Sequence, residues 1–569
     1  MARVYESFLR QRLTRRRLIG GAAALSSAGI VLAACKGGKK NGPGGSTPNP
    51  NETPTLGGTI HLRQPGNSAL PSLSPFGPTA LVSTLIFGFT TYDHLWYVPL
   101  DTGNVEKMLA QEIEMVDPEG MEINVTLKPS VFHDRPPVSG RAVIAQDVVE
   151  SWYAFRDDPF GLGRDWLQVI LDKLVAVDDL TLKIVQKRQW AWMFGGAGAG
   201  SPASSSVLPR ETIDMPDLLR TDVIGSGRLQ FESAPAGQNV KLLAFPNWRI
   251  AGEPYYGGVD LVYVPEFTAA EAQFAAAGLD QLDFQNKLQA DDMQGRLGDQ
   301  MTLTSELSRA YHSIWLKALP PFDDPKVRKA FRLAVNRPEM IQLVERDAAG
   351  GVVSGIVPPA QKLYALPEDD PDLQEYVRYD KDEARRLLEE ADFPFDRTFT
   401  LLISSPSEEL ADRATVLKDQ LSRVGIKVTI EAQDLLSVWV PRVLLAADYE
   451  ITLFTHLEYE EPYLPLAFYT NFSPIGPKDE RGRTNMAFYD QEISDAVDAT
   501  SLEIDQDARI EKVQAAQKLI MQKEGPMINL YSSVNFTGRR SWFKGWISGR
   551  GNFGLFNGRA WIDTSMRGS

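Results

Sequence analysis

The feature that most constrains the fold is a regular alternation of helix and strand patterns between residues 380 and 455. Asp380 and Glu383 form a capping-box pattern before the first helix, and Gly425 ends the second. Helix patterns alternate with strand patterns over residues 381–391, 399–403, 408–424, 426–430, 434–446 and 449–455. This alternation predicts a mostly parallel α/β unit.

The chain has 569 residues, which is too long for one ordinary hydrophobic core, so we expect two or three domains. A hydrophobic fraction of 43% and 11 Trp are typical of a packed globular protein. The formal net charge is −15, and residues 1–34 contribute +5, which leaves −20 for the rest. Such an acidic body argues against nucleic acid as a partner and against electrostatic docking to anionic lipid.

The N-terminus carries an export pattern. Residues 14–20, Thr-Arg-Arg-Arg-Leu-Ile-Gly, resemble a twin-arginine motif, and an uncharged run of 17 residues, 18–34, follows. The run ends in Leu-Ala-Ala before Cys35, which matches a lipobox. A transmembrane anchor is the alternative, but the run is short and only weakly apolar for one. We therefore expect residues 1–34 to be a lipoprotein signal peptide.

Cys35 is the only cysteine, so it cannot form an internal disulfide, and it occupies the position that bacterial lipoproteins acylate. Residues 35–56 are rich in Gly, Pro, Asn, Ser and Thr, which is typical of a flexible tether. The pattern predicts an exported protein, lipid-anchored through Cys35 on the outer face of the cytoplasmic membrane.

Residues 321–337 read as a capped amphipathic helix followed by a second helix start. Asp324 is the expected N-cap and Pro325 the first helical residue, and Asn336 with Glu339 forms another capping box. Val327, Ala330, Phe331 and Ala334 share an apolar face, with the basic residues largely elsewhere. The segment resembles a signature of the extracellular solute-binding proteins of family 5, the peptide- and nickel-binding receptors of transport systems.

Other segments resemble the same family, in the same order along the chain. They include the strand pattern after Gly57-Gly58, the run from Lys128 to Asp134, residues 145–151, and Tyr255-Tyr256-Gly257-Gly258. The resemblance covers roughly residues 57–531. It implies an α/β fold of the type II periplasmic-binding-protein class, with two lobes, a hinge and an extra inserted subdomain.

The resemblance also implies domain limits and a role. We expect lobe I at 57–91, 205–310 and 525–569, the insert at 92–204 and lobe II at 311–524. A monomeric receptor of this class binds a peptide or other small solute between its lobes and delivers it to the permease subunits of an ABC importer. Binding, and not catalysis, is expected.

Motifs for other chemistry are missing from the sequence. The five histidines are scattered without metal-ligand spacing, and no Gly-x-Ser-x-Gly elbow occurs, so we expect no metal, no cofactor and no catalytic residue. Residues 195–200, Gly-Gly-Ala-Gly-Ala-Gly, lack the Gly-Lys-Ser/Thr of a phosphate loop and are interpreted as a flexible surface loop.

Residues 455–462, Thr-His-Leu-Glu-Tyr-Glu-Glu-Pro, follow the last predicted strand, where ligands lie in open α/β sheets. They resemble the family segment whose first acid binds the α-ammonium of peptides; Glu458 matches that acid, with Tyr459, Glu461 and Pro462 in register. His456 stands where peptide binders often carry Trp. Trp166 and Trp439 resemble positions near the ligand, and core packing is the alternative for both, as a solvated loop is for Glu458.

Three alternatives stay open. The same fold could bind an oligosaccharide or another non-peptide solute. A lipid-anchored hydrolase would need a nucleophile–base set that the sequence does not show. An adaptor or chaperone could bind protein partners through an open form.

Overall fold

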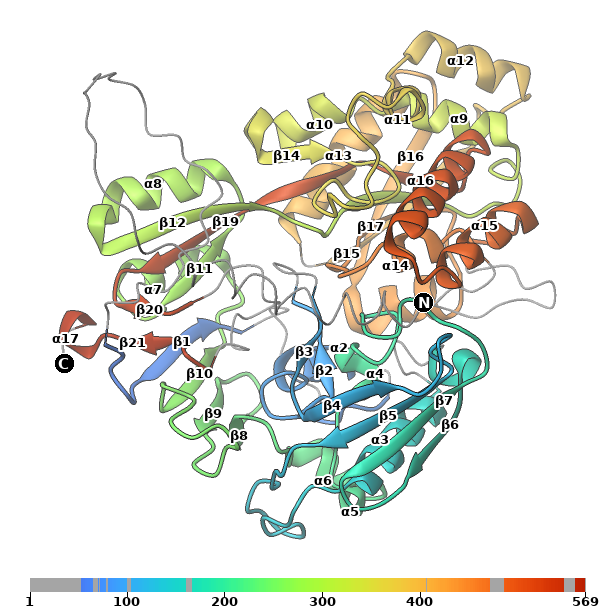
Figure 1. Ribbon diagram of the computed structural model, residues 1–569. Coiled ribbons are helices and arrows are strands. Elements are labelled where there is room, and N and C mark those ends of the chain that lie inside the picture. Colours follow the sequence, from blue (N-terminus) through green and yellow to red (C-terminus); the bar gives the residue numbers. More distant parts are fainter. Residues whose placement is uncertain are drawn as a thin grey trace, which may run out of the picture.

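The computed structural model describes residues 53–64, 70, 72–77, 80–99, 104–159, 166–405, 407–470, 486–546 and 558–567. The predicted signal peptide, the lipidation residue Cys35 and most of the tether lie outside these residues. The described chain folds into three main sheets with helices packed on them (Figure 1). No helix of the described part is long and apolar enough to cross a membrane.

The first sheet has eight strands from distant parts of the chain. Its order is β12 (Met301–Leu307), β19 (Tyr531–Arg540), β11 (Gln281–Phe284), β1 (Thr59–Arg63), β10 (Gly258–Val262), β9 (Val240–Ala244) and β8 (Leu229–Ser233), with β14 (Gly351–Val353) also paired to β19. Only the pairs that β1 makes, with β10 and β11, are parallel. Helices α7 (Phe267–Ala275) and α8 (Lys287–Leu297) share a hydrophobic cluster with this sheet.

The second sheet confirms the predicted α/β alternation. Its order is β16 (Lys427–Asp434), β15 (Thr398–Ser405), β17 (Ile451–Thr455), β13 (His312–Leu316) and β18 (Met527–Asn529). The three strands foreseen from the alternation, β15, β16 and β17, are mutually parallel, whereas β13 pairs antiparallel with both β17 and β18. Helix α12 (Lys381–Glu390) begins after Asp380, whose carboxylate accepts the Glu383 N–H at 2.9 Å.

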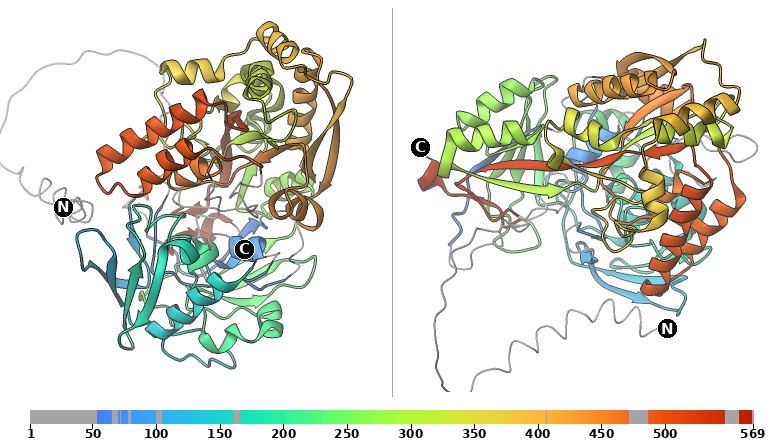
Figure 2. Two further views of the ribbon diagram at one scale, coloured as in Figure 1. Left: turned by 90° about the vertical axis from the view of Figure 1, so that its right-hand side faces the viewer. Right: turned by 90° about the horizontal axis from the view of Figure 1, so that it is seen from above.

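The two sheets are joined where β12 leads to β13 and where β18 leads to β19 (Figure 1). Residues 308–311 make the first connection, and Leu530 alone separates β18 from β19. The expected lobe I limit at residue 525 precedes β18, which pairs with β13 in the second sheet. From this junction, the long strand β19 runs along the first sheet between β12 and β11 (Figure 2).

The third sheet lies within residues 92–204, which we call the insert. It is an antiparallel meander in the order β4 (Ala110–Met115), β5 (Glu122–Leu127), β7 (Thr181–Gln186) and β6 (Leu171–Ala176). Helix α3 (Ala145–Asp157) packs against it, and its buried residues Trp152 and Phe155 belong to the largest hydrophobic cluster.

The two N-caps of the signature segment form as predicted, but the capping box at Asn336 does not, because the Asn336 N–H donates to Oε1 of Gln420 at 3.1 Å and not to Glu339. Helix α9 (Pro325–Ala334) begins with Asp324, which accepts the Lys326 N–H at 2.7 Å, and α10 (Arg337–Val344) begins with Asn336, which accepts the Glu339 N–H at 3.1 Å. The expectation that the basic residues avoid the buried face is wrong for two of them. Arg328 and Arg332 are buried, because carbonyl and carboxylate oxygens receive their guanidinium groups.

The described residues form several further elements. The small strand pairs are β2 (Trp96–Tyr97) with β3 (Glu106–Lys107), and β20 (Phe543–Lys544) with β21 (Trp561–Ile562). The other helices are α2 (Ala80–Phe87), α4 (Pro202–Ser205), α5 (Arg210–Ile213), α6 (Pro216–Thr221), α11 (Pro371–Val377), α13 (Glu408–Ser422), α14 (Tyr463–Ala467), α15 (Gln491–Ser501), α16 (Gln506–Gln522) and α17 (Thr564–Arg567). Short 3-10 helices cover Gly298–Gln300 and Ala348–Gly350, and π-helical segments cover Trp166–Ile170 and Leu435–Leu445.

Candidate functional site

The candidate site is the segment of residues 455–462, which we call the acidic segment. It leaves the second sheet at the carboxyl end of β17, where Thr455 pairs with His312 of β13. Glu458, Tyr459, Glu460 and Glu461 follow within four positions. The segment thus begins beside residues 308–311, which connect the first and second sheets.

His456 lies in a buried box of aromatic side chains. Its ring stacks on Tyr311 with centroids 4.1 Å apart, and Phe454, Phe468 and Trp315 surround it. Nε2 lies 2.8 Å from the Ser313 hydroxyl. Burial lowers the pKa of His456 well below its usual value, so the ring is neutral and acts as an aromatic, hydrogen-bonding surface.

Glu458 is half-buried and contacts the connection between the sheets. Its Oε1 accepts a hydrogen bond from the Ser308 hydroxyl at 2.7 Å. Ser308 directly follows β12, and its own N–H donates to the Ser533 carbonyl of β19. The carboxylate therefore sits where elements of both sheets meet, although Ser308 and Glu458 are 150 positions apart in sequence.

Glu460 is half-buried like Glu458, and Glu461 is buried, at 7% exposed. Burial raises the pKa of Glu460 to about 7, with Glu458 adding repulsion and Arg309 opposing it. Burial also raises the pKa of Glu461 to about 8, with Glu460 as the next cause. The Gln361 amide supports this turn by donating to the Tyr459 carbonyl at 2.9 Å and to the Glu461 carbonyl at 3.3 Å.

The glycine run of residues 195–200 packs against this acidic segment. The Glu461 carboxyl accepts hydrogen bonds from the backbone N–H groups of Gly196, at 3.1 Å, and of Ala197. The interpretation as a surface loop is wrong for residues 197–200, which are buried. The run folds back on itself in tight turns, in which the N–H groups of Gly198 and Gly200 both donate to the Gly195 carbonyl.

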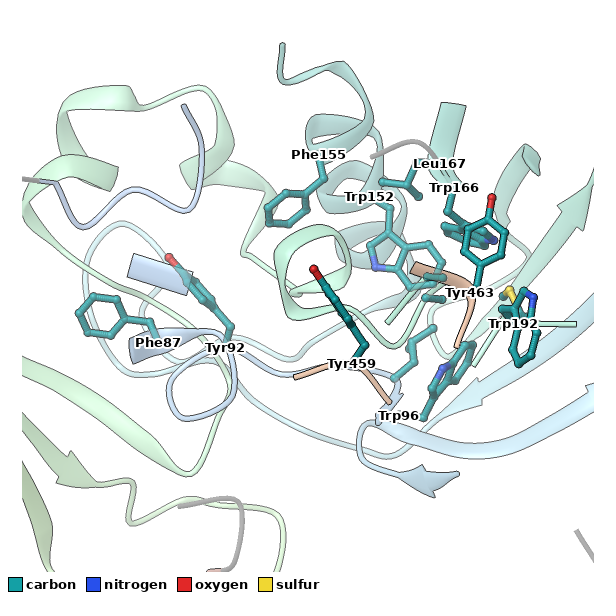
Figure 3. Close-up of a cluster of buried hydrophobic side chains, with 14 of the residues drawn as sticks. Phe87, Tyr92, Trp96, Trp152, Phe155, Trp166, Leu167, Trp192, Tyr459 and Tyr463 are labelled. Carbon is teal, nitrogen blue, oxygen red and sulfur yellow. The ribbon is translucent and has the colours of Figure 1, made fainter. Parts of the chain in front are cut away.

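Tyr459 joins the aromatic core of the insert. It is 8% exposed and belongs to the same hydrophobic cluster as Trp152 and Trp166. In Figure 3, Tyr459 and Tyr463 lie among ring side chains of the insert, namely Tyr92, Trp96, Trp152, Trp166 and Trp192. The acidic segment thus contributes side chains to a hydrophobic cluster that it shares with the insert.

The two predicted tryptophans are buried in different places. Trp439 is 1% exposed; its ring stacks on Phe454 at 5.3 Å, and its N–H donates to the Thr452 hydroxyl at 3.2 Å. Trp166 is 2% exposed and packs edge-on against Trp152 in the insert. Phe454 contacts the rings of both Trp439 and His456 and so connects them.

The structure therefore brings His456, Glu458 and Tyr459 together with residues that the sequence did not single out. Those residues are Ser308, Tyr311, Ser313 and Gln361, which come from other elements. Only the fold could reveal them, because Ser308 and Glu458 are 150 positions apart. Within the described ranges, no group of three or more His, Cys, Asp or Glu side chains is placed to hold a metal ion.

Known proteins are similar in sequence to more than half of this chain. The chain is 25% identical to the oligopeptide-binding protein AppA of Bacillus subtilis over 423 residues, which cover 70% of this chain and 73% of AppA. It is 27% identical to the glutathione-binding protein GsiB of Pectobacterium atrosepticum over 331 residues, which cover 56% of this chain and 59% of GsiB, less than two thirds of that relative.

A similar fold occurs in the periplasmic binding protein DppA of Helicobacter pylori, solved with the peptide STSA. The TM-score is 0.77 at 18% identity, and the match covers 90% of this chain and 99% of DppA. The two-lobed, type II periplasmic-binding-protein fold expected from the sequence is therefore confirmed. The model of the bacterial extracellular solute-binding proteins, family 5, matches residues 104–472, and the chain belongs to this family.

Proposed function

We propose that this protein is a receptor that binds peptides outside the cytoplasmic membrane and delivers them to the permease of an ABC importer. The observation that carries the proposal is the position of Glu458, a half-buried carboxylate at the end of β17 that also contacts Ser308. Among the residues that the structure describes, Glu458 forms no ion pair. A peptide ammonium group would supply the missing counter-charge.

The same proposal assigns the neighbouring side chains. Tyr459 and His456 would contact the peptide next to its amino terminus, and Trp439 and Trp166 would form aromatic walls farther along. Relatives named for oligopeptide and glutathione binding support a peptide ligand. No residue is proposed to be catalytic, in keeping with a family of binding proteins.

The working motion would be closure of two lobes around the solute. We propose lobe I from residues near 57–91, 205–310 and the chain after β18, with the insert at 92–204 and lobe II at 311–529. A ligand that contacts both lobes favours the closed form through its higher affinity for that form. The closed form would then dock on the permease subunits as a monomer.

The membrane attachment is part of the proposal. Residues 1–34 would direct export through the twin-arginine route, and acylation of Cys35 would anchor the protein, with residues 35–56 as the tether. Two or more acyl chains bind a membrane firmly because each buried methylene contributes about 0.8 kcal/mol.

Calorimetry on the full-length protein tests the role of Glu458. The probes are tetrapeptides with a free amino terminus and the same peptides acetylated there. Glu458→Gln should weaken binding of the free peptides by about 10-fold to 100-fold, as expected for loss of a charge-assisted hydrogen bond. Acetylated peptides should bind weakly to the wild type and be unaffected by the substitution.

The control is Glu511→Gln, which changes an exposed glutamate in α16. Equal affinity of wild type and Glu458→Gln for free peptides would refute the role of Glu458. Absence of binding by any peptide would refute the proposed ligand class.

An oligosaccharide is the second candidate ligand. A sugar ring would pack on a flat aromatic face, and the indole of Trp439, which is 1% exposed and stacked on Phe454, would have to become exposed to supply one. A thermal-shift screen separates the two classes, since a specific ligand raises the unfolding midpoint by mass action. Stabilisation by an oligosaccharide and not by peptides would replace the peptide proposal.

A further inference from the structure

One segment of the insert runs along the part of the chain that carries the second sheet. We call residues 188–197 the strap. Arg188 forms an ion pair with Asp498 of α15, with NH1 2.8 Å from Oδ2, and the Ala191 N–H donates to the Ser501 carbonyl at 2.7 Å. The strap is thus bound at its beginning by polar contacts that require no solute.

The middle of the strap is held by aromatic contacts. Trp190 packs edge-on against Tyr463 with centroids 4.8 Å apart, and Trp192 packs against Tyr364 at 5.8 Å. The guanidinium of Arg509, from α16, lies 5.1 Å from the centroid of Trp192. These contacts aim the end of the strap at the acidic segment.

The end of the strap closes on Glu461. Both oxygens of this carboxyl group accept backbone N–H groups, those of Gly196 and Ala197. A Cβ atom at position 195 would clash with the Glu461 carboxyl, and one at position 196 would lie 2.5 Å from Oε2 of Glu460. Only glycines allow the carboxyl groups to approach the backbone this closely.

The later glycines of the run serve a different contact. A Cβ atom on Gly198 or Gly200 would collide with backbone atoms of the strap itself, between Trp192 and Gly195. These two glycines therefore make the turn possible. Gly195 and Gly196 instead leave room for side chains from another part of the chain.

We propose that Glu461 and the turn of Gly195, Gly196 and Ala197 form a latch that holds the insert on the second-sheet part of the molecule, with or without solute. Glu461 is a positioning residue: by binding the turn, it places Glu458, three residues earlier, in its half-buried position. The role of the latch in solute capture rests on the proposed function, whereas the contact itself is testable without any solute.

Hydrogen–deuterium exchange on the full-length, solute-free protein tests the latch. The reporting peptide contains the amides of Gly196 and Ala197. In the wild type these amides should exchange slowly. Glu461→Ala removes both acceptors without changing the sequence of the reporting peptide, and should speed exchange of the two amides at least about 10-fold. Glu511→Ala is the matched control and should leave them unchanged.

Glu461→Gln retains one carbonyl acceptor and should show an intermediate rate. Gly196→Ala blocks the approach from the other side, and Gly295→Ala is its control because a Cβ there meets nothing within 4 Å. Fast exchange of the two amides in the wild type, or equal rates in the wild type and Glu461→Ala, would overturn the latch. A variant that loses protection across the whole chain is unfolded, and Glu461→Gln then decides the question.

The experiments can refute the latch and the peptide proposal independently of each other. Protected amides in a protein that binds no peptide would support the latch and refute the peptide proposal. Peptide binding by a wild type whose two amides exchange fast would support the peptide proposal and refute the latch.

Discussion

Arg332 and Glu524 form a buried, two-pronged ion pair. Nε of Arg332 lies 2.8 Å from Oε2 of Glu524, and NH2 lies 2.7 Å from Oε1. The same guanidinium donates to the carbonyls of Glu375 and Tyr376. One side chain of the signature helix α9 therefore ties together α11 and the residues that lead into β18.

Glu524→Gln should lower the free energy of unfolding by about 3–5 kcal/mol. The substitution keeps the shape of the side chain but leaves the Arg332 charge, which is 2% exposed, with only the half-exposed Glu375 carboxylate, 3.7 Å away, as its counter-charge. Urea unfolding measures the change. Glu390→Gln, which breaks an exposed pair with Arg386, should cost at most about 1 kcal/mol. Equal, small losses in both variants would show that Arg332 does not depend on Glu524.

Stability should depend on pH through Glu460 and Glu461. Apart from the repulsion between the two groups, the charges that act on Glu460 are Glu458 on the same segment and Arg309 from the connection between the sheets. Because burial raises the pKa of Glu460 to about 7 and of Glu461 to about 8 from 4.5, folding favours the protonated forms. Their contribution should be complete below about pH 4.5 and lost as the pH rises through 7 to 8.

Urea unfolding of the full-length protein between pH 4.5 and 9 checks this dependence. The double variant with Glu460→Gln and Glu461→Gln cannot titrate at these positions, so the difference from the wild type isolates the two groups. The wild type should lose stability relative to the double variant as the pH rises. A constant difference across this range would contradict the prediction.

Trp439→Ala should lower the free energy of unfolding by about 3–5 kcal/mol, because the indole is 1% exposed and its removal leaves a large cavity beside Phe454. Solute affinity distinguishes the proposed wall from a purely structural role. A wall residue should also weaken binding in the folded variant, in calorimetry at a temperature well below its unfolding midpoint. Unchanged affinity would remove Trp439 from the proposed site.

Cys35→Ser should move the protein from the membrane fraction to the soluble extracellular fraction, because serine cannot be acylated through a thioether. Fractionation followed by immunoblotting measures the shift. Ser46→Ala, within the tether, is the control and should leave the protein at the membrane. Membrane attachment of Cys35→Ser would indicate that residues 18–34 are retained as an anchor.

Local structure in this chain was largely predictable because it depends on neighbours in sequence. The caps at Asp324, Asn336 and Asp380 each bind an N–H two or three residues away, so the residue pattern suffices to place them. The parallel strands β15, β16 and β17 follow from the same kind of pattern, since each connection between them contains a helix. The order of motifs then indicated the family.

Contacts between distant segments were not predictable in the same way. Nothing in the pattern of residues 321–337 indicates that Arg328 and Arg332 are buried, since their acceptors include Glu524, almost 200 positions later. The sheet to which β18 belongs was not predictable for a related reason. A short apolar strand fits either sheet, and its pairing with β13 decides between them.

The sequence by itself determined the fold class, the family and the acidic segment as the place to look for a ligand, because motifs and periodicity record local geometry. The tertiary structure alone decided which side chains meet there. Ser308 reaches Glu458 across 150 positions, and the Gly196 N–H reaches Glu461 across 265. The physical reason is that burial and hydrogen-bond pairing depend on which surfaces the fold brings together. The residue pattern of one segment does not indicate which distant segment will pack against it.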